Sequence, residues 1–332
     1  MSRTADLGYA AGWRLLRLLP LGLTAPAFNA VSDVTTRRRG KGVARLAGNL
    51  RRVVGPDLSE ADLDALVRRA MRSYYRYALE AFRLPSQSRE QNLRGFHLDG
   101  ADMLAADVAT GRGAVVALPH AGNWDAAGAW VAANGWPMIT VAERLKPESL
   151  YRRFVAFREG LGMEILPLTG GDGSVREALE ERLRRGYVVP ILADRDLTAN
   201  GVEVRFFGAR TTVPPGPALL ALRTGAPLYT VDMWFTENDA RGRLRGPLPL
   251  PGPEVGSFGA RVRQLAQTIV DGLAEGIAAH PADWHMMQRM WPDDAVMDGG
   301  RPVVRDDRAV VGDDRAVGTG DGAGATDDEA GR

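Results

Sequence analysis

The sequence has 332 residues, 45% of them hydrophobic, which is enough to bury the core of one large domain with appended segments. Its formal net charge is +1 and it contains no cysteine, which excludes disulfides, thiolate metal ligands and thiol nucleophiles. The charge is unevenly distributed, because residues 37–52 hold basic side chains and no acid, whereas aspartates are frequent after Asp293.

The amino-terminal residues 9–31 come nearest to a membrane segment. Arg14 and Arg17 interrupt their apolar character, and a spanning helix needs roughly 20 predominantly apolar residues. Pro20 and Pro26 are also expected to break a helix here. Leucines and a tryptophan beside the arginines, followed by the basic run, favour a helix lying in the headgroup region of an anionic membrane. The alternative is a pair of helices packed on the core with a solvated basic face.

These features predict a division of the chain into three parts. Residues 1–56 are expected to form an amphipathic and basic membrane-associating segment, and residues 57–293 an α/β domain. Residues 294–332 are rich in Gly, Asp, Arg and Thr with few large apolar side chains, which is typical of a disordered tail.

The next segment, residues 57–83, predicts a long helix. Asp57 or Ser59 is placed to cap it, and apolar residues then recur at three- and four-residue spacing. The tyrosines near its end are expected in the core, and His97, in a polar connection beyond it, is interpreted as structural.

The centre of the chain is the stretch from Ala114 to Asp125. Ala114 to Leu118 is a run of small and β-branched residues between glycine-rich turns, which is typical of a parallel strand covered on both faces. If His120 and Asp125 lay in one regular helix, their side chains would point about 140° apart. With His120 in a turn and Asp125 in the first turn of a helix entered through Gly122-Asn123, the carboxylate is expected to reach back to the imidazole. That arrangement is typical of a general base.

Further strands are expected to end near this histidine. Residues 137–145 predict a strand ending at Glu143, and residues 187–197 a buried strand that delivers Asp194, Arg195 and Asp196. Because the carboxyl ends of parallel strands meet at one edge of a sheet, these side chains are expected near His120. An ordinary ion-pair cluster is the alternative for the two acids that flank the arginine.

The remaining motifs predict no metal or nucleotide site. His280 and His285 lack a third ligand at useful spacing, so packing is the preferred interpretation. The glycine turn at residues 170–173 lacks the lysine of a phosphate-binding loop and is interpreted as the entry to a helix capped by Ser174.

Several blocks follow one another in order along the chain. They are LPHAGNWDAAG, VAERLKPESLYRRFVAFREGLGMEILPL, ILADRDL, VRFFG with the later VPPGPALLALRTGAPL, and DWHMMQRMW. Together they resemble the bacterial lysophospholipid and lipid A acyltransferase superfamily, in particular its actinobacterial phosphatidylinositol mannoside acyltransferase family. The similarity extends over residues 9–291.

The resemblance implies an α/β fold with a glycerol-3-phosphate-acyltransferase-like, mostly parallel central β-sheet flanked by helices and an amphipathic helical amino terminus. It implies transfer of a long acyl chain, chiefly palmitoyl, from acyl-CoA to the 6-hydroxyl of mannose in phosphatidylinositol mannosides. The implied place is the cytoplasmic face of the plasma membrane, with peripheral attachment. The expected partners are acyl-CoA, mannosylated phosphatidylinositol and an anionic membrane surface, with no permanently bound cofactor, no metal and no nucleic acid.

The resemblance also assigns roles to residues. His120 matches the catalytic histidine and Asp125 the aspartate of its motif. Glu143 and Arg158 match polar positions of the family's catalytic groove, and an arginine there suits phosphate on acyl-CoA or on the glycolipid.

A second carboxylate is expected to approach the histidine. Asp194 falls near that position, and Glu203 is the alternative. His120 would then take the proton from the acceptor hydroxyl while Asp125 or Asp194 holds the imidazole. Backbone N–H groups of the turn after His120 are candidates to stabilise the oxyanion.

Other functions remain open at this point. The same base would serve a lysophospholipid or a lipid A-type acceptor. An ester hydrolase would usually present Gly-x-Ser-x-Gly, which the sequence lacks. A non-enzymatic peripheral membrane-binding protein would use the amino-terminal segment alone.

Overall fold

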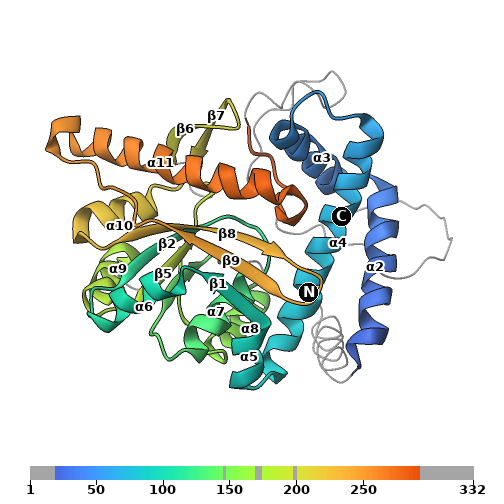
Figure 1. The fold of residues 1–332 in the computed structure, drawn as a ribbon, viewed down its shortest axis with the longest axis horizontal. Coiled ribbons are helices and arrows are strands. Elements are labelled where there is room, and N and C mark those ends of the chain that lie inside the picture. The colour runs from blue at the N-terminus through green and yellow to red at the C-terminus, as the bar shows by residue number, and fades with distance from the viewer. Residues whose placement is uncertain (1–18, 145–146, 169–173, 197–199, 292–332) are drawn as a thin grey trace, which may run out of the picture.

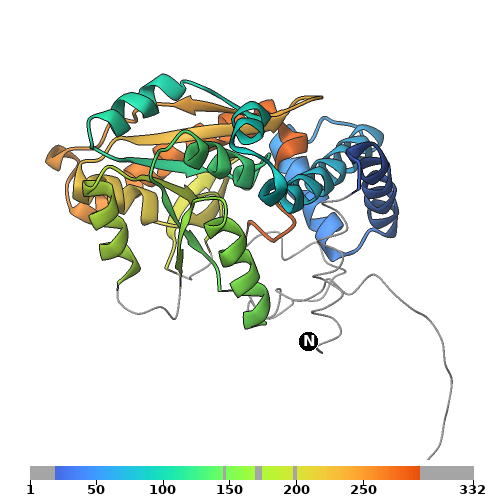
Figure 2. The ribbon, with the colours of Figure 1, turned by 90° about the horizontal axis from the view of Figure 1, so that it is seen from below.

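The computed structural model describes residues 19–144, 147–168, 174–196 and 200–291. The first part of the expected amphipathic segment and the expected tail from residue 294 lie outside these ranges. The described chain forms an α/β body, with three amino-terminal helices packed at one end of it (Figure 1, Figure 2).

The core of the body is a five-stranded sheet with the order β1-β9-β8-β2-β5. Neighbouring strands are parallel except β8 and β9, so the predicted mostly parallel sheet is confirmed. Its strands are β1 (Phe96–Asp99), β2 (Ala114–Leu118), β5 (Val188–Leu192), β8 (Leu228–Phe235) and β9 (Ala240–Arg245).

Two further pairs of strands flank this sheet. The parallel pair β3 (Ile139–Ala142) and β4 (Glu164–Pro167) continues it beyond β5, because Met138 bridges Val188 in parallel. The antiparallel pair β6 (Val202–Phe206) and β7 (Ala209–Val213) forms a hairpin under the last long helix.

Helices cover both faces of the sheet, which explains why all five residues of β2 are buried. One face lies against α6 (Ala101–Ala109) and α7 (Trp124–Ala133). The other lies against α10 (Gly216–Thr224) and α11 (Phe258–Ala279), where Gly272 allows α11 to approach Thr230 of β8 closely. The shorter α5 (Arg89–Gly95), α8 (Glu148–Glu159) and α9 (Val175–Arg184) complete the body.

The amino-terminal helices are α2 (Leu21–Arg38), α3 (Lys41–Val54) and α4 (Glu60–Arg83). The predicted break at Pro26 is wrong, since α2 continues through it and Pro20 occupies the cap position before the helix. A proline in the second turn deprives only one carbonyl of its helical donor. Helix α4 begins after Ser59, whose side chain accepts from the Asp62 amide, as one of the two predicted caps.

Helix α3 packs against the body. It buries Val43, Leu46 and Leu50, and Asn49 donates hydrogen bonds of 2.7 and 2.9 Å to backbone carbonyls near the end of the described chain. Within the described ranges, no helix is both long enough and apolar enough to cross a membrane.

The strands that the sequence did not reveal, β1, β7 and β9, carry several polar residues. His97, expected in a polar connection, lies on β1, while β9 alternates arginines with apolar residues and β7 carries two threonines. Polar residues within these strands weaken the apolar pattern from which strands are recognised.

Candidate active site

The site lies at the carboxyl ends of β2 and β5. The parallel register pairs Leu118 with Leu192, so His120 and Asp194 each follow two residues beyond the last pair. The His120 amide donates to Asp194 Oδ2 at 2.9 Å, and His120 Nδ1 lies 2.6 Å from Asp194 Oδ1. The prediction that these side chains meet at one sheet edge is confirmed.

The environment of Asp194 keeps the carboxylate ionised. Its side chain is 0% exposed. Burial alone would raise its pKa, but the charge of His120 and hydrogen bonds from His120 and Trp284 hold the pKa below the usual value. An ionised carboxylate at Nδ1 makes that nitrogen the donor, which leaves Nε2 with a free lone pair. His120 therefore has the tautomer of a proton acceptor, and its side chain is 23% exposed.

Glu203, the alternative second carboxylate, lies elsewhere. It belongs to β6, its side chain is 66% exposed, and its recorded ionic neighbour is Arg210 at 3.9 Å. The geometry therefore selects Asp194.

Asp125 lies where it was predicted, in the first turn of α7, but it does not hold the imidazole. Asn123 caps this helix by accepting from the Ala126 amide at 2.9 Å. Asp125 accepts instead from Tyr77 Oη at 2.9 Å and from Arg158 Nε at 2.7 Å. The start of α7 directs this side chain towards α4 and α8, while the neighbouring strand β5 supplies the partner of His120.

Arg158, expected to bind phosphate, instead forms a buried ion pair with Asp125. Its side chain is 18% exposed and that of Asp125 is 2% exposed. Burial opposes the charge of Arg158, but the Asp125 carboxylate raises its pKa above the usual value. Burial and the charge of Asp125 raise the pKa of Tyr77, so it stays a neutral donor. The three residues form a closed polar cluster next to the dyad.

Two other charged groups lie at the same edge of the sheet. Glu143 follows β3 and is exposed, and Arg195 follows Asp194 and is partly buried. Burial lowers the pKa of Arg195, with Glu143 as the main opposing charge. In the described part of the chain, no carboxylate lies within ion-pair distance of Arg195 and no hydrogen bond to it is formed. Arg195 is therefore available to an anion. The sequence predicted the place of Arg195 at this edge of the sheet, with an ion-pair cluster as one interpretation, but it did not assign Arg195 this role.

An apolar cavity lies between α7 and the sheet face on which Val116 and Leu118 project. Trp124 lines it, and the ring of Trp124 lies 5.9 Å from that of His120. Asp125 and Arg158 supply its polar wall. Its other lining residues include Leu104, Gly128, Trp130, Met138, Met163, Val188, Leu192, Val231, Met233 and Leu244.

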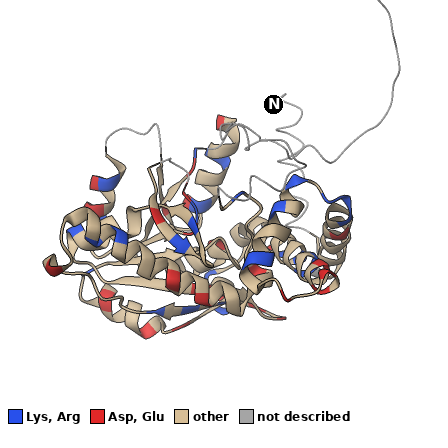
Figure 3. Ribbon diagram, turned by 90° about the horizontal axis from the view of Figure 1, so that it is seen from above, with Lys and Arg blue, Asp and Glu red and all other residues tan. Residues whose placement is uncertain are grey.

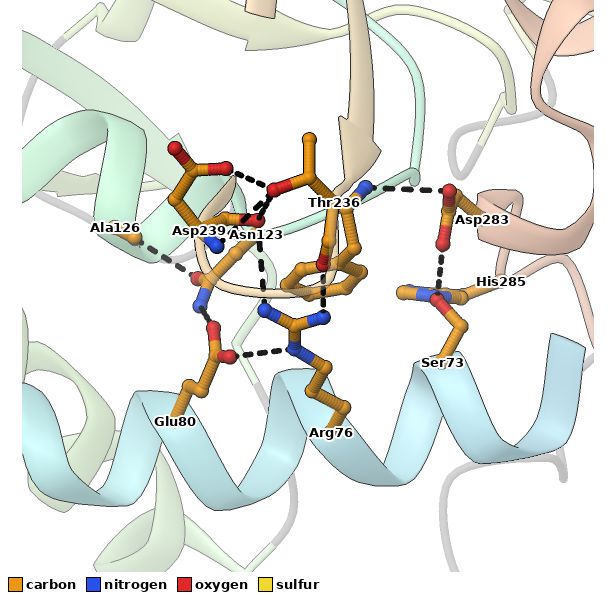
Figure 4. A network of polar contacts seen from close by, with 10 residues as sticks. Ser73, Arg76, Glu80, Asn123, Ala126, Thr236, Asp239, Asp283 and His285 are labelled. Atoms are coloured by element: carbon orange, nitrogen blue, oxygen red, sulfur yellow. Dashed lines mark hydrogen bonds and ion pairs between the residues drawn. The ribbon is translucent and has the colours of Figure 1, made fainter. Parts of the chain in front are cut away.

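Helix α4 supports the site through polar residues on one face (Figure 4). Glu80 accepts from Asn123 Nδ2 at 2.9 Å and from Arg76 Nε at 2.7 Å, so it holds the residue that caps α7. Arg76 in turn donates to the carbonyl of Thr236 after β8. The sequence spacing of Ser73, Arg76 and Glu80 indicates that they share one face of the helix, but it does not predict which residues they contact.

Ser73, Asp283 and His285 have the composition of a hydrolase triad but not its connectivity. Ser73 Oγ donates to Asp283 Oδ1 at 2.6 Å and lies 2.9 Å from His285 Nε2 (Figure 4). Burial lowers the pKa of His285 to about 3, and the charge of His120 adds to this effect. Because the serine hydroxyl donates its hydrogen bond to the aspartate and the histidine is buried, the cluster is a packing element, as expected for His285.

The other two histidines show no catalytic geometry. His280 stacks on Trp234 with ring centroids 4.5 Å apart, and His97 is 53% exposed beside Asp239. Among the residues that the structure describes, no group of three or more His, Asp or Glu side chains is arranged to hold a metal ion.

Comparisons with known proteins bear on this arrangement. The model of the bacterial lipid A biosynthesis acyltransferase family matches residues 2–292. The chain belongs to this family. It is also similar to a protein of Mycolicibacterium smegmatis named phosphatidylinositol mannoside acyltransferase, with 46% identity over 88% of this chain and 93% of that protein. A protein of the same name from Mycobacterium tuberculosis is 45% identical over 89% of this chain and 91% of its own length. The resemblance inferred from the ordered sequence blocks is confirmed. The histidine and aspartate at the ends of β2 and β5 therefore belong to a protein of an acyltransferase family.

Asp194 contacts the imidazole, whereas Asp125 pairs with Arg158, and the supporting role of Asp125 can be tested by measuring the free energy of unfolding. Asp125→Asn would leave the buried guanidinium of Arg158 without its counter-charge. We expect the free energy of unfolding to fall by about 3–5 kcal/mol, the range for breaking a buried ion pair. Urea unfolding followed by circular dichroism measures it.

The matched control is Asp64→Asn, which removes the exposed partner of Arg39. It should cost less than about 1 kcal/mol. Equal losses for the two variants would contradict a supporting role for Asp125.

Proposed function

We propose that this chain transfers a long acyl chain, palmitoyl in the first instance, from acyl-CoA to the 6-hydroxyl of mannose in phosphatidylinositol mannosides. The single observation that carries the proposal is the His120–Asp194 dyad, in which Nδ1 contacts a buried carboxylate and Nε2 has no hydrogen-bond partner among the described residues. The relatives that bear the name of this activity supply the acceptor class.

The chemistry requires one base and one leaving group. His120 Nε2 takes the proton from the mannose hydroxyl as its oxygen attacks the thioester carbon. The tetrahedral intermediate collapses, the carbon–sulfur bond breaks, and the imidazolium returns the proton to the departing thiolate of CoA. Asp194 stabilises the transient imidazolium, because its carboxylate remains ionised at Nδ1.

The oxyanion needs a donor that is not already used. The two amides directly after His120 are occupied, since Ala121 N–H donates to the Pro119 carbonyl and Gly122 N–H donates to the Asp283 carbonyl. The buried indole N–H of Trp124 has no hydrogen-bond partner in the described part, and this side chain lines the cavity beside His120. We therefore assign Trp124 as a candidate donor in place of the predicted amides.

The acyl tail is proposed to enter the cavity between α7 and the sheet. The cavity holds about 100 Å³, less than the roughly 300–1,000 Å³ of typical ligand sites, so its walls must move. Met138, Met163 and Met233 line it, and methionine is the side chain best suited to repacking around a flexible chain.

Arg195 is proposed to hold a substrate phosphate, the role expected for Arg158 from sequence. Arg158 is bound to Asp125, whereas Arg195 lies at the same sheet edge without an ion pair among the described residues. A guanidinium suits this contact because it binds phosphate through two parallel hydrogen bonds.

Membrane contact is proposed through α2. Its exposed apolar residues fall on one helical face, and they are Leu23, Ala27, Ala30, Val31 and Val34. Leu23 is 66% exposed, Val31 47% and Val34 44%, and the basic residues Arg37 and Arg38 end the helix. An apolar stripe ending in arginines suits peripheral attachment to an anionic surface, here the cytoplasmic face of the plasma membrane.

The basic run contributes less to membrane binding than its sequence indicates. Arg39 pairs with Asp64 and Arg51 with Glu60, two acids of the neighbouring helix α4, and Figure 3 shows basic and acidic residues side by side in this part of the structure. We therefore expect the apolar stripe on α2 to contribute more to membrane binding than the basic run does.

The function is tested by transfer of labelled palmitate from palmitoyl-CoA to mannosylated phosphatidylinositol, lysophosphatidic acid and water. We expect ester formation on the mannoside. His120→Ala should lower kcat by about 10² to 10⁴-fold with the fold unchanged, because it removes the base. His97→Ala, at an exposed histidine, is the matched control and should retain activity.

Preferential acylation of lysophosphatidic acid would overturn the proposed acceptor. Transfer that survives His120→Ala would overturn the proposed base. No transfer to any acceptor by folded wild-type protein would reject the enzymatic function.

The phosphate contact is tested by Arg195→Gln. We expect the KM of one phosphate-bearing substrate, acyl-CoA or the glycolipid, to rise about tenfold, since a charge-assisted hydrogen bond is worth roughly 1.5–3 kcal/mol. Arg195→Lys should recover part of the loss. The control Arg210→Gln alters an arginine that is 69% exposed on β7. Unchanged KM values for both substrates in Arg195→Gln would contradict the assignment.

The membrane contact is tested by the double substitution Leu23→Asp and Val34→Asp. Sedimentation with vesicles of phosphatidylinositol and phosphatidylcholine should show at least about tenfold weaker binding, because two charges replace two exposed apolar side chains that would otherwise enter the membrane surface. Phe258→Asp, at an exposed apolar residue of α11, is the control. Equal binding by all three proteins would reject α2 as the membrane-binding face.

A further inference from the structure

The short segment Asp283 to His285 is bound along the turn that carries His120. Trp284 forms an antiparallel bridge with Ala121. The His285 amide donates to the His120 carbonyl at 2.8 Å, and the Gly122 amide donates to the Asp283 carbonyl at 2.9 Å. This segment, which we call the clasp, therefore fixes the backbone on both sides of the catalytic turn.

The clasp also reaches the carboxylate of the dyad. Trp284 Nε1 donates to Asp194 Oδ2 at 2.9 Å, and both side chains are 0% exposed. The His120 amide donates to the same oxygen at 2.9 Å. With two donors on Oδ2, the other oxygen, Oδ1, is left to face the imidazole at 2.6 Å.

The indole is itself held firmly in place. Its ring lies 6.1 Å from Phe206, 6.1 Å from Phe207 and 6.5 Å from Trp291. On the other side, Ser73 of α4 binds the side chains of both neighbours of Trp284 (Figure 4). A donor with so little freedom can fix the orientation of a buried carboxylate.

We propose that Trp284 is a positioning residue of the acyl transfer, which orients Asp194 through its indole N–H and thereby sets the proton affinity of the His120 imidazole. The inference rests on the proposed function, in which that imidazole is the base. It assigns to the clasp a role in positioning the base, whereas the sequence predicted only packing for His285.

The sign of the effect follows from the hydrogen bonds. Without the indole N–H, Oδ2 keeps one donor in a site from which water is excluded, so the carboxylate is less stabilised and attracts the imidazolium more strongly. The protonated imidazole then persists to higher pH. The other ionisable groups near the dyad include His285 on the clasp, which its lowered pKa keeps neutral, and Arg195 with the neighbouring acids Glu143 and Asp196. The substitution leaves all of them in place.

The experiment removes the indole N–H donor and keeps an aromatic ring at position 284. In Trp284→Phe, and in a protein carrying 3-benzothienylalanine at position 284, the aromatic ring remains and the donor is lost. The benzothienyl group has nearly the shape of indole, so it remains informative if Trp284→Phe fails to fold. The matched control is the same pair of changes at Trp291, whose indole N–H donates to the Phe206 carbonyl at 3.2 Å.

Two readouts are followed. In full-length protein without substrate, NMR titration of the His120 imidazole should show its protonation midpoint shifted upward by about half a pH unit or more for the changes at position 284 and unshifted at 291. With palmitoyl-CoA and the mannosylated acceptor, kcat should fall about tenfold at position 284 with KM unchanged. The acid limb of the pH–rate profile should move in the same direction as the NMR midpoint.

The outcomes separate this inference from the proposed function. An unshifted His120 titration in the folded variants at position 284 overturns the inference, whether or not activity falls, because a structural defect alone would lower kcat. Equal effects at positions 284 and 291 also overturn it. If wild-type protein shows no transfer while the NMR midpoint shifts, the proposed function fails and the coupling between Trp284 and the dyad stands.

Discussion

The parallel pairing of β2 with β5 is the constraint on which the site depends. It brings His120 and Asp194, 74 residues apart in sequence, to equivalent positions beyond two buried strands. A shift of register by one residue would reverse the direction of each side chain and separate them. The register is secured by the apolar residues of β2 and β5, which are enclosed by helices on both faces, so the hydrophobic core determines the geometry of a hydrogen bond at its edge.

Around this hydrogen bond, the polar residues divide into those that face the dyad and those that hold its surroundings. Asp194 and Trp284 contact His120 or its partner, whereas Asp125, Arg158 and Tyr77 form a separate buried cluster. The second cluster closes one wall of the apolar cavity and joins α4, α7 and α8. A charged pair at that place costs desolvation and is retained only where its geometry satisfies both partners, which agrees with a fixed supporting role.

Helix α4 connects the amino-terminal helices with the site. One of its faces packs against α2, while Ser73 and Glu80 bind the clasp and the cap of α7. In the proposed function, the helix that contacts the membrane is therefore one helix removed from the residues that position the base. The acceptor in that proposal is a membrane lipid. A membrane-binding face close to the dyad would therefore help the acceptor hydroxyl to reach His120.

The sequence by itself determined the strands and the helix around the site and the sheet edge at which the site forms. The run from Ala114 to Leu118, the helix entry through Gly122-Asn123 and the placement of Asp194 at a strand end follow from local pattern and from the rule that parallel strands end together. Only the tertiary structure decided which carboxylate holds His120, that Arg158 is bound to Asp125, and that Trp284 reaches Asp194. These contacts join segments 33 to 90 residues apart, and their choice depends on where a side chain points after folding. Local propensity carries no information on that direction, because a first-turn aspartate is equally favourable whichever neighbour the packing of α4, α8 and β5 presents to it.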